Sequence, residues 1–158
     1  MKDLRDFLTK IEGMTGEFLT TTKAVNPTLE LTRVIYKLEK EQKDPAVLFK
    51  NVSGCQYPVL TNLFGNRKRL AAALDTNEAE VNLVYREREK NLLPPVLVST
   101  APVQEIVFEG NDVRLDMLPV VTHNSGDVGP YITAGIMTVR DPETKIRNSG
   151  IYRLMIRA

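Results

Sequence analysis

The residues best suited to chemistry lie near the C-terminal end, in the run 147–153 (Arg-Asn-Ser-Gly-Ile-Tyr-Arg). Side chains alternate between the two faces of a β-strand, so Asn148 and Tyr152 would share one face. Ile151 and Arg153 would share the other. An arginine among apolar strand residues is unusual, because a guanidinium is rarely buried without a partner. Arg153 therefore either faces solvent, which the periodicity alone favours, or meets an anion or a carboxylate.

Three other features could carry chemistry, and each also has a simpler structural role. The glycines of the loop 124–130 would let its backbone approach a phosphate. The loop lacks the lysine and the spacing of known phosphate-binding fingerprints, which favours a connecting loop. His123, the single histidine, precedes this loop, and a surface or packing role is its simpler interpretation. Cys55 has no histidine nearby, which indicates a buried packing residue rather than a nucleophile.

Composition excludes several classes of protein. The 158 residues include 21 Lys and Arg, 20 Asp and Glu, one His and one Cys. A net charge of +1 argues against a nucleic-acid-binding domain, which usually carries a basic face. A single Cys suits a reducing cytoplasm, and one His with one Cys excludes a self-contained zinc site. The charged N-terminus indicates no secretory signal, and the longest uncharged run, 91–104, is shorter than the roughly 20 residues of a membrane span.

The elements that must position these residues follow from hydrophobic periodicity and turn residues. An α+β fold is expected, with an N-terminal α/β domain over 1–104 and a second domain over 105–158, because prolines cluster in the connector 92–119. Helices are expected over 4–11, from Asn26-Pro27 until Asp44-Pro45 breaks the helix, from about Asn66 with Leu70 and Leu74 on it, and from Asn77 with Val81, Val84 and Tyr85 on its buried face. Strands are expected over 18–22, 46–49, 58–62, 105–108, 131–140 and 146–157, the last two forming a hairpin.

With these elements in place, the sequence resembles the UbiD family of decarboxylases, which depend on prenylated flavin mononucleotide (prenylated FMN). The resemblance extends over nearly the whole chain and rests on the joint order and spacing of short motifs. It implies that 105–158 begins a flavin-binding split β-barrel. The motifs are residues 3–8, 48–52, 58–65, 118–119, 129–133, 141–144 and 147–153.

The resemblance implies roles for four residues. In the family, the asparagine that matches Asn148 is a ligand of a divalent metal, usually manganese, which also holds the cofactor phosphate. An amide oxygen is a hard ligand suited to that metal. The family's Ile-Tyr-Arg contacts the flavin and matches Ile151, Tyr152 and Arg153. Its arginine also belongs to a catalytic Glu-Arg-Glu network, in which a permanent cation steers the substrate carboxylate. His123 does not match the family's metal-binding histidine, which follows the asparagine.

The resemblance also implies what the whole protein does. Family enzymes are longer, and their remaining metal ligands and both network glutamates lie beyond the position of Ala158, so we expect an N-terminal fragment that is inactive alone. The intact protein is expected to be a reversible, non-oxidative decarboxylase of aromatic or α,β-unsaturated acids, acting on a polyprenyl-hydroxybenzoate in quinone biosynthesis. We expect a homo-oligomer, with peripheral membrane association through a lipid-tailed substrate.

Two alternatives remain open at this point. The chain could be a non-catalytic binding or assembly module of a multi-subunit carboxylase. An unrelated flavin-binding split barrel, such as a flavin reductase, would explain the hairpin but not residues 1–100.

Overall fold

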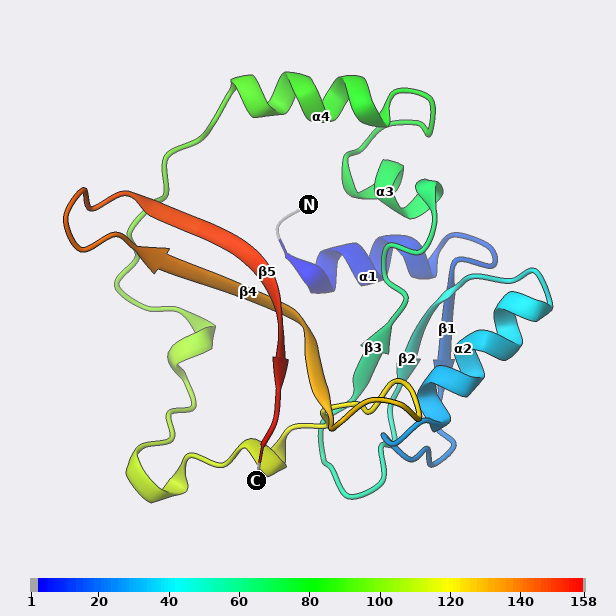
Figure 1. The fold of residues 1–158 in the computed structure, drawn as a ribbon. Helices are drawn as coiled ribbons and strands as arrows, with labels where there is room; N and C mark the ends of the chain where they lie inside the picture. The colour runs from blue at the N-terminus through cyan, green and yellow to red at the C-terminus, as the bar shows by residue number, and fades with distance from the viewer. Residues whose placement is uncertain (1–2, 158) are drawn as a thin grey trace. The chain divides into compact units, whose positions relative to one another are not determined.

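The computed structural model describes residues 3–157, and Figure 1 traces their helices and strands. Helices and strands are mixed along the chain, which confirms the expected α+β class. None of the helices within residues 3–157 has the length and apolar character needed to cross a membrane. In chain order the elements are α1 (Leu4–Glu12), β1 (Phe18–Thr21), α2 (Glu30–Lys40), β2 (Ala46–Phe49), β3 (Val59–Thr61), α3 (Arg67–Ala73), α4 (Val81–Lys90), three short 3-10 helices (Pro102–Gln104, Gly110–Asp112, Leu115–Met117), β4 (Tyr131–Arg140) and β5 (Arg147–Met155).

Helix α1 forms as its apolar spacing predicts. Asp3 caps it, because its side chain accepts a hydrogen bond from the backbone N–H of Asp6 at 3.0 Å. The helix ends before Gly13. Phe7 and Ile11 are buried and pack in one cluster with Ala46 of β2 and Ala72 of α3.

Strands β1, β2 and β3 form one sheet in that order. The Ala46 N–H donates to the Glu17 carbonyl and the Lys50 N–H to the Thr21 carbonyl, both at 2.9 Å. From the first bond to the second, the residue numbers rise by four in both segments, so β1 and β2 are parallel. Parallel neighbours need a crossover connection, and α2 supplies it.

Helix α2 begins three residues later than the Asn-Pro pair at 26–27 suggests. The Asn26 side chain accepts from the Thr28 N–H at 2.8 Å, which makes a local turn instead of a helix cap. Leu29 then adopts a left-handed conformation with φ 66°, and the helix starts at Glu30. The expected apolar stripe is otherwise confirmed, with Leu31 buried and Val34, Ile35 and Leu38 partly buried.

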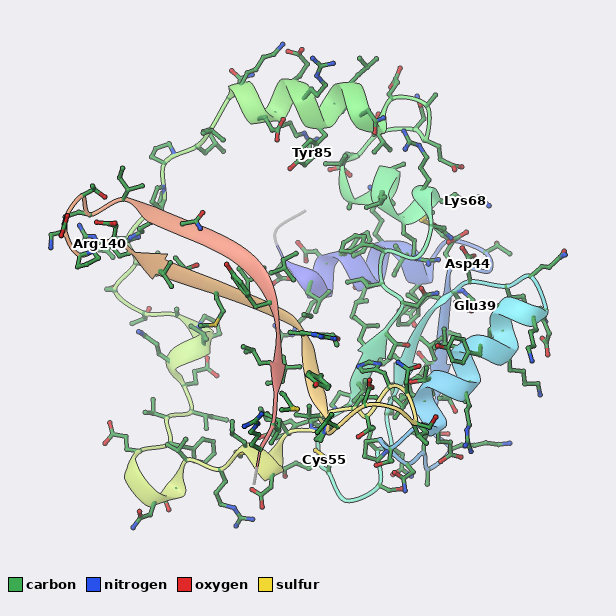
Figure 2. The ribbon with its side chains drawn as sticks, in the orientation of Figure 1. Glu39, Asp44, Cys55, Lys68, Tyr85 and Arg140 are labelled. Atoms are coloured by element: carbon green, nitrogen blue, oxygen red, sulfur yellow. The ribbon has the colours of Figure 1, made fainter. Side chains whose placement is uncertain are left out.

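Helix α3 buries a charged residue, and helix α4 leaves one expected core residue exposed. Leu70 of α3 is 37% exposed, while its neighbour Arg69 is fully buried. In α4, Val81 is buried as expected, but Tyr85 is 55% exposed (Figure 2). Arg69 takes the inward position because partners distant in sequence satisfy its guanidinium.

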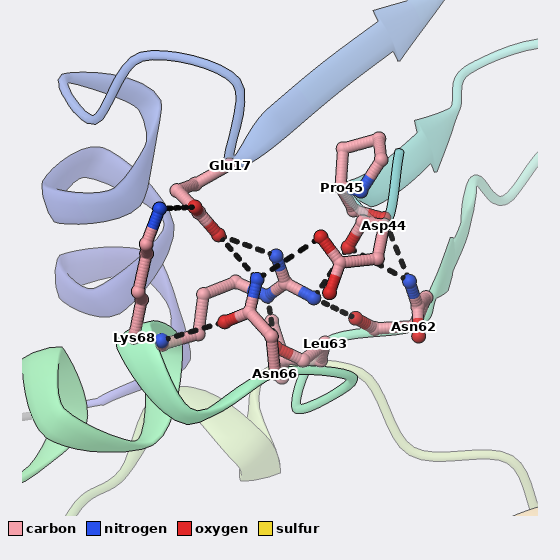
Figure 3. Close-up of polar contacts among 8 residues, drawn as sticks. Glu17, Asp44, Pro45, Asn62, Leu63, Asn66 and Lys68 are labelled. Carbon is pink, nitrogen blue, oxygen red and sulfur yellow. Dashed lines mark hydrogen bonds and ion pairs between the residues drawn. The ribbon is translucent and has the colours of Figure 1, made fainter. Parts of the chain in front are cut away.

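Those partners form a network that ties four segments of the chain together (Figure 3). Arg69 donates from Nη1 to the Glu17 carboxylate at 2.6 Å, from Nη2 to the Asp44 carbonyl at 2.6 Å and the Asn62 carbonyl at 3.1 Å, and from Nε to the Leu63 carbonyl at 2.9 Å. Four hydrogen bonds therefore satisfy a cation that is out of contact with water.

The connector between α4 and β4 is irregular. The expected strand over 105–108 is absent from the described structure, where these residues lie between the 3-10 helices Pro102–Gln104 and Gly110–Asp112. Its apolar residues stay exposed, with Ile106 at 72% and Val107 at 66%. A short apolar run forms a stable strand only when a neighbouring strand pairs with it.

Strands β4 and β5 form the expected hairpin as a separate two-stranded sheet. β4 has the expected bounds, and β5 is shorter at both ends than the range 146–157. Asp141 organises the connecting turn, since its carboxylate accepts from the N–H groups of Thr144 at 2.6 Å and Glu143 at 2.8 Å. These two hydrogen bonds hold the pKa of Asp141 below its ordinary value, and the bond from Thr144 has the larger effect.

The chain divides into two compact units by packing, and both combine segments distant in sequence. The sequence predicts two consecutive domains that meet at residue 104/105, whereas these units are defined by packing. The domain boundary therefore stays a prediction, as does a split barrel over 105–158. The first unit holds the described residues up to Thr20, Lys43–Leu48 and Leu60–Arg114; the second holds Thr21–Gln42, Phe49–Val59 and the described residues from Leu115 onward.

Candidate functional site

The four residues singled out in the sequence all lie on β5. Its antiparallel register with β4 pairs Val139 with Asn148, Ile136 with Ile151 and Gly135 with Tyr152. Thr138 and Ser149 are also paired, and their hydroxyls lie 2.8 Å apart. This cross-strand hydrogen bond helps to fix the register next to Asn148.

The register is interrupted opposite Arg153. Between the pairs Ile132–Leu154 and Gly135–Tyr152, β4 advances by three residues while β5 advances by two. Thr133 and Ala134 of β4 therefore both face Arg153 across the ladder. This is a β-bulge, a feature that bends a strand and re-aims the neighbouring side chains.

Arg153 packs over an aromatic ring. Its guanidinium carbon lies 5.4 Å from the centre of the Tyr131 ring, within the range of a cation–π interaction. Arg153 is exposed, so one face of the guanidinium rests on the ring while its N–H groups remain available to another partner. The solvent-facing placement that periodicity favoured is confirmed, but the side chain is held rather than free.

Gly150 makes room for the Tyr152 ring. A Cβ built on Gly150 would lie 2.8 Å from Cε2 of Tyr152, which is too close for any real side chain. The ring therefore lies against the strand backbone at Gly150, on the same face as Asn148. Both Tyr152, at 54%, and Ile151, at 76%, present large exposed apolar area.

Asn148 is exposed, and within residues 3–157 no hydrogen bond engages its side chain. Its amide oxygen is thus available as a hard ligand for a divalent cation. The described residues contain no group of three or more His, Cys, Asp or Glu side chains that could complete such a site. Asn148 can thus supply one oxygen ligand, and residues 3–157 place no such group beside it.

The alternation along β5 separates the four residues into two pairs. Asn148 and Tyr152 lie on one face, and Ile151 and Arg153 on the other, as the sequence predicts. Asn148 and Arg153 are five residues apart, which is roughly 16 Å along an extended strand. The strand thus carries the amide oxygen of Asn148 near one end and the guanidinium of Arg153 near the other.

The remaining candidates lie elsewhere in the described structure. Cys55 is partly buried, and its Sγ lies 3.1 Å from the Met117 carbonyl oxygen, in keeping with a packing role. His123 is partly buried in the segment before β4. The loop that follows it is held by Asp127, whose carboxylate accepts from the Asn124 N–H at 2.9 Å.

Two sequence models of one family match the chain. The N-terminal domain of 3-octaprenyl-4-hydroxybenzoate carboxy-lyase matches residues 13–88, and the Rift-related domain of the same enzyme matches residues 96–158. The chain belongs to the UbiD family. All of β4 and β5 falls within the second match, so the candidate residues lie in the Rift-related domain of this UbiD chain.

Solved structures of UbiD enzymes agree with this assignment. HmfF from Pelotomaculum thermopropionicum in complex with FMN is 36% identical over 96% of this chain and 34% of its own, with a TM-score of 0.85. An evolved dimeric form of HmfF with prFMN gives 36% identity over 98% and 36%, with a TM-score of 0.86. Vanillic acid decarboxylase from Sedimentibacter hydroxybenzoicus, in closed form, gives 29% over 100% and 36%, with a TM-score of 0.88. The UbiD chain described here spans about a third of the length of these relatives.

The aromatic partner of Arg153 was not predicted from the sequence. Tyr131 stands in the motif 129–133, but nothing in that motif indicates contact with a residue 22 positions later. The signal that could have found it is the hairpin register, because Tyr131 pairs with Met155, two residues from Arg153 on the same face. The bulge in β4 has no local sequence signal of its own.

Proposed function

We propose that the protein to which this UbiD chain belongs is a non-oxidative, reversible decarboxylase of aromatic or α,β-unsaturated carboxylic acids. The observation that carries the proposal is Arg153, exposed on β5, supported by Tyr131 and set opposite a bulge. A family match to carboxy-lyases and the likeness to flavin-bound relatives support it. Polyprenyl-hydroxybenzoate is the substrate that the family description favours.

Prenylated FMN, when bound, supplies the electron sink for loss of carbon dioxide, and the protein supplies position and electrostatics. Ile151 and Tyr152 offer exposed apolar surface to such a ring system. These two side chains lie on opposite faces of β5, so one ligand meets both only where it crosses the edge of the strand. Asn148 offers its amide oxygen to a divalent metal, for which manganese is the proposed ion, beside the cofactor phosphate.

Arg153 is proposed as the residue that binds the substrate carboxylate. A guanidinium presents paired N–H donors that match the two oxygens of a carboxylate. The Tyr131 ring beneath it limits the rotamers of a long side chain, so less conformational entropy is lost when the substrate binds. The same permanent cation favours the ionised form of a neighbouring carboxyl group, which fits a role beside a glutamate proton donor.

The intact protein is further proposed to be cytoplasmic and homo-oligomeric; an evolved form of one relative is dimeric. Peripheral contact with a membrane through a lipid-tailed substrate stays a prediction.

The test compares three variants of the intact protein. Arg153→Ala should lower turnover per bound flavin about a hundredfold or more, with the bound flavin measured by its absorbance, because a positioned charge is lost. Arg153→Lys should retain only part of the turnover, since an ammonium cannot make the planar two-point contact with a carboxylate. Arg147→Gln is the matched control, an exposed arginine on the same face of β5, and should keep normal turnover.

Asn148→Ala should act differently from Arg153→Ala. It should reduce the amount of metal and flavin that the protein retains, and turnover should fall only as a consequence of that loss. Near-normal turnover in Arg153→Ala with flavin bound would show that Arg153 has no catalytic role and is an ordinary exposed strand residue.

A further inference from the structure

We propose that a second site, distinct from the β5 residues, binds a phosphate group between α2 and the segment 123–125. A pocket of about 250 Å³ lies there, within the second compact unit. Figure 1 shows the yellow segment before β4 passing the start of α2. Six polar side chains line the pocket, and none of the lining residues is acidic: Thr32, Arg33, Tyr36, His123, Asn124 and Ser125.

Hydrogen bonds hold the two walls of this pocket against each other. The Leu29 N–H donates to the Thr122 carbonyl at 2.9 Å, and the Thr122 N–H donates to the Pro27 carbonyl at 3.2 Å. The Tyr36 hydroxyl donates to Oδ1 of Asn124 at 3.4 Å. The pocket is therefore built by the fold before any ligand arrives, which lowers the entropic cost of binding.

The pocket lining is rich in hydrogen-bond donors that no protein acceptor uses. Within residues 3–157, no hydrogen bond or ion pair engages the guanidinium of Arg33 or the ring of His123. Oδ1 of Asn124 already accepts from the Tyr36 hydroxyl, so the Asn124 side chain offers a ligand only the N–H donors of its Nδ2. The hydroxyls of Thr32 and Ser125 add two further donors.

Two carboxylates close in sequence to the pocket residues already accept hydrogen bonds. Asp127 accepts from the Asn124 N–H at 2.9 Å, and Glu30 accepts from the Asn26 N–H at 2.7 Å. Each of these bonds makes its carboxylate a weaker competitor for Arg33. The site thus carries an uncompensated cation among neutral donors, which is the composition of an oxyanion site.

A phosphate suits this arrangement better than a carboxylate. The donors come from two elements, α2 and the segment 123–125, and so approach the pocket from different sides. A tetrahedral group with several acceptor oxygens can use donors from both sides, whereas a planar carboxylate is satisfied by the guanidinium alone. The ligand is therefore a phosphate, either free or carried by a small molecule.

The test is a titration of the purified chain followed by ¹H–¹⁵N NMR at constant ionic strength. Inorganic phosphate, phenyl phosphate and benzoate are the three probes. Saturable shifts are expected for the amides of Arg33, His123 and Ser125 with both phosphates. Tighter binding of phenyl phosphate would identify a phosphate carried by a small molecule, and equal binding would identify free phosphate.

Two variants make the test specific. Arg33→Gln should weaken phosphate binding about tenfold, because a charge-assisted hydrogen bond is lost. Lys37→Gln removes an exposed cation one turn further along α2, outside the pocket lining, and should change affinity less than twofold. Equal losses in both variants, benzoate binding as tight as phosphate, or shifts scattered over the chain would overturn the proposal. None of these readouts depends on flavin or turnover, so the outcome is independent of the proposed decarboxylase activity.

Discussion

The buried Arg69 offers the sharpest test of what holds the N-terminal elements together. Its side chain is 0% exposed and that of its partner Glu17 is 7% exposed, with 2.6 Å between Nη1 and Oε2. The two residues are 52 positions apart, so their ion pair joins the start of β1 to α3. Removing one partner of a buried pair leaves the other charge without compensation, which typically costs about 3–5 kcal/mol.

Arg69→Met isolates this effect, because methionine keeps much of the apolar stem and removes only the guanidinium. The variant leaves Glu17 with the Asn66 amide, at 2.7 Å, and the distant ammonium of Lys68, at 3.6 Å. It also removes the Arg69 donor from the Leu63 carbonyl, while the Asp44 carbonyl keeps the Asn62 side-chain amide at 3.0 Å and the Asn62 carbonyl keeps the Gly65 N–H at 3.3 Å. A loss of about 3–5 kcal/mol is a large share of the roughly 5–15 kcal/mol that stabilises a typical domain.

Urea unfolding followed by circular dichroism measures this loss, and two further variants interpret it. The double variant Glu17→Gln with Arg69→Met should recover at least about 1 kcal/mol relative to Arg69→Met, because the isolated charge is gone. Lys68→Gln is the matched control. Lys68 approaches the same carboxylate, but its side chain is 59% exposed, so its removal should cost less than about 1 kcal/mol.

An Arg69→Met variant whose free energy of unfolding lies within about 1 kcal/mol of the parent chain would contradict the role of the ion pair. A double variant that is no more stable than Arg69→Met would contradict it as well. Either result would mean that the apolar packing around Arg69, and not the ion pair, stabilises this part of the fold.

Two other predictions concern single contacts. The pKa of Asp75 lies below its ordinary value of 3.8, first because Lys10 donates a hydrogen bond to the carboxylate and second because Lys10 is positively charged. The folded-state pKa is therefore lower than the unfolded-state pKa. The contribution of this pair to folding stability is present above the unfolded-state pKa and is lost as the pH falls through the folded-state pKa. Carboxyl ¹³C titration should show this depressed pKa, and Lys10→Gln should return it towards 3.8; an unchanged pKa would contradict the role of Lys10. Gly150→Ala should displace the Tyr152 ring and change its NMR shifts, because the new Cβ would lie 2.8 Å from Cε2, whereas Gly126→Ala, with nothing within 4 Å, should change little. A Tyr152 ring that keeps its shifts in Gly150→Ala would show that the ring does not rest on this glycine.

Local patterns in the sequence were sufficient for most of the elements around the candidate site. Apolar strand residues on both sides of the Asp-Pro-Glu-Thr turn predict the hairpin, and β4 has the predicted bounds. The alternation of side chains along any strand assigns Asn148 and Arg153 to opposite faces. These features depend on residues close together in the chain, so the sequence carries them directly. The order of short motifs, likewise readable without a structure, identified the UbiD family.

Long-range contacts decided the rest. The run Arg67-Lys68-Arg69 has the appearance of a solvated helix face, yet Arg69 is the residue that turns inward, because acceptors from Glu17, Asp44 and Asn62 converge there. No pattern within α3 contains those acceptors.

Partners in space also decided the outcome at the other sites. Residues 105–108 have the composition of a strand, but no strand pairs with them in the described structure. The support of Arg153 by Tyr131 depends on the register of two strands and on a bulge between them. The order of residues is enough to assign side-chain types to strands and to their faces. Which cation is buried and which is exposed depends on tertiary contacts, because the free energy of a charged group depends on the partners and the solvent that the fold brings to it.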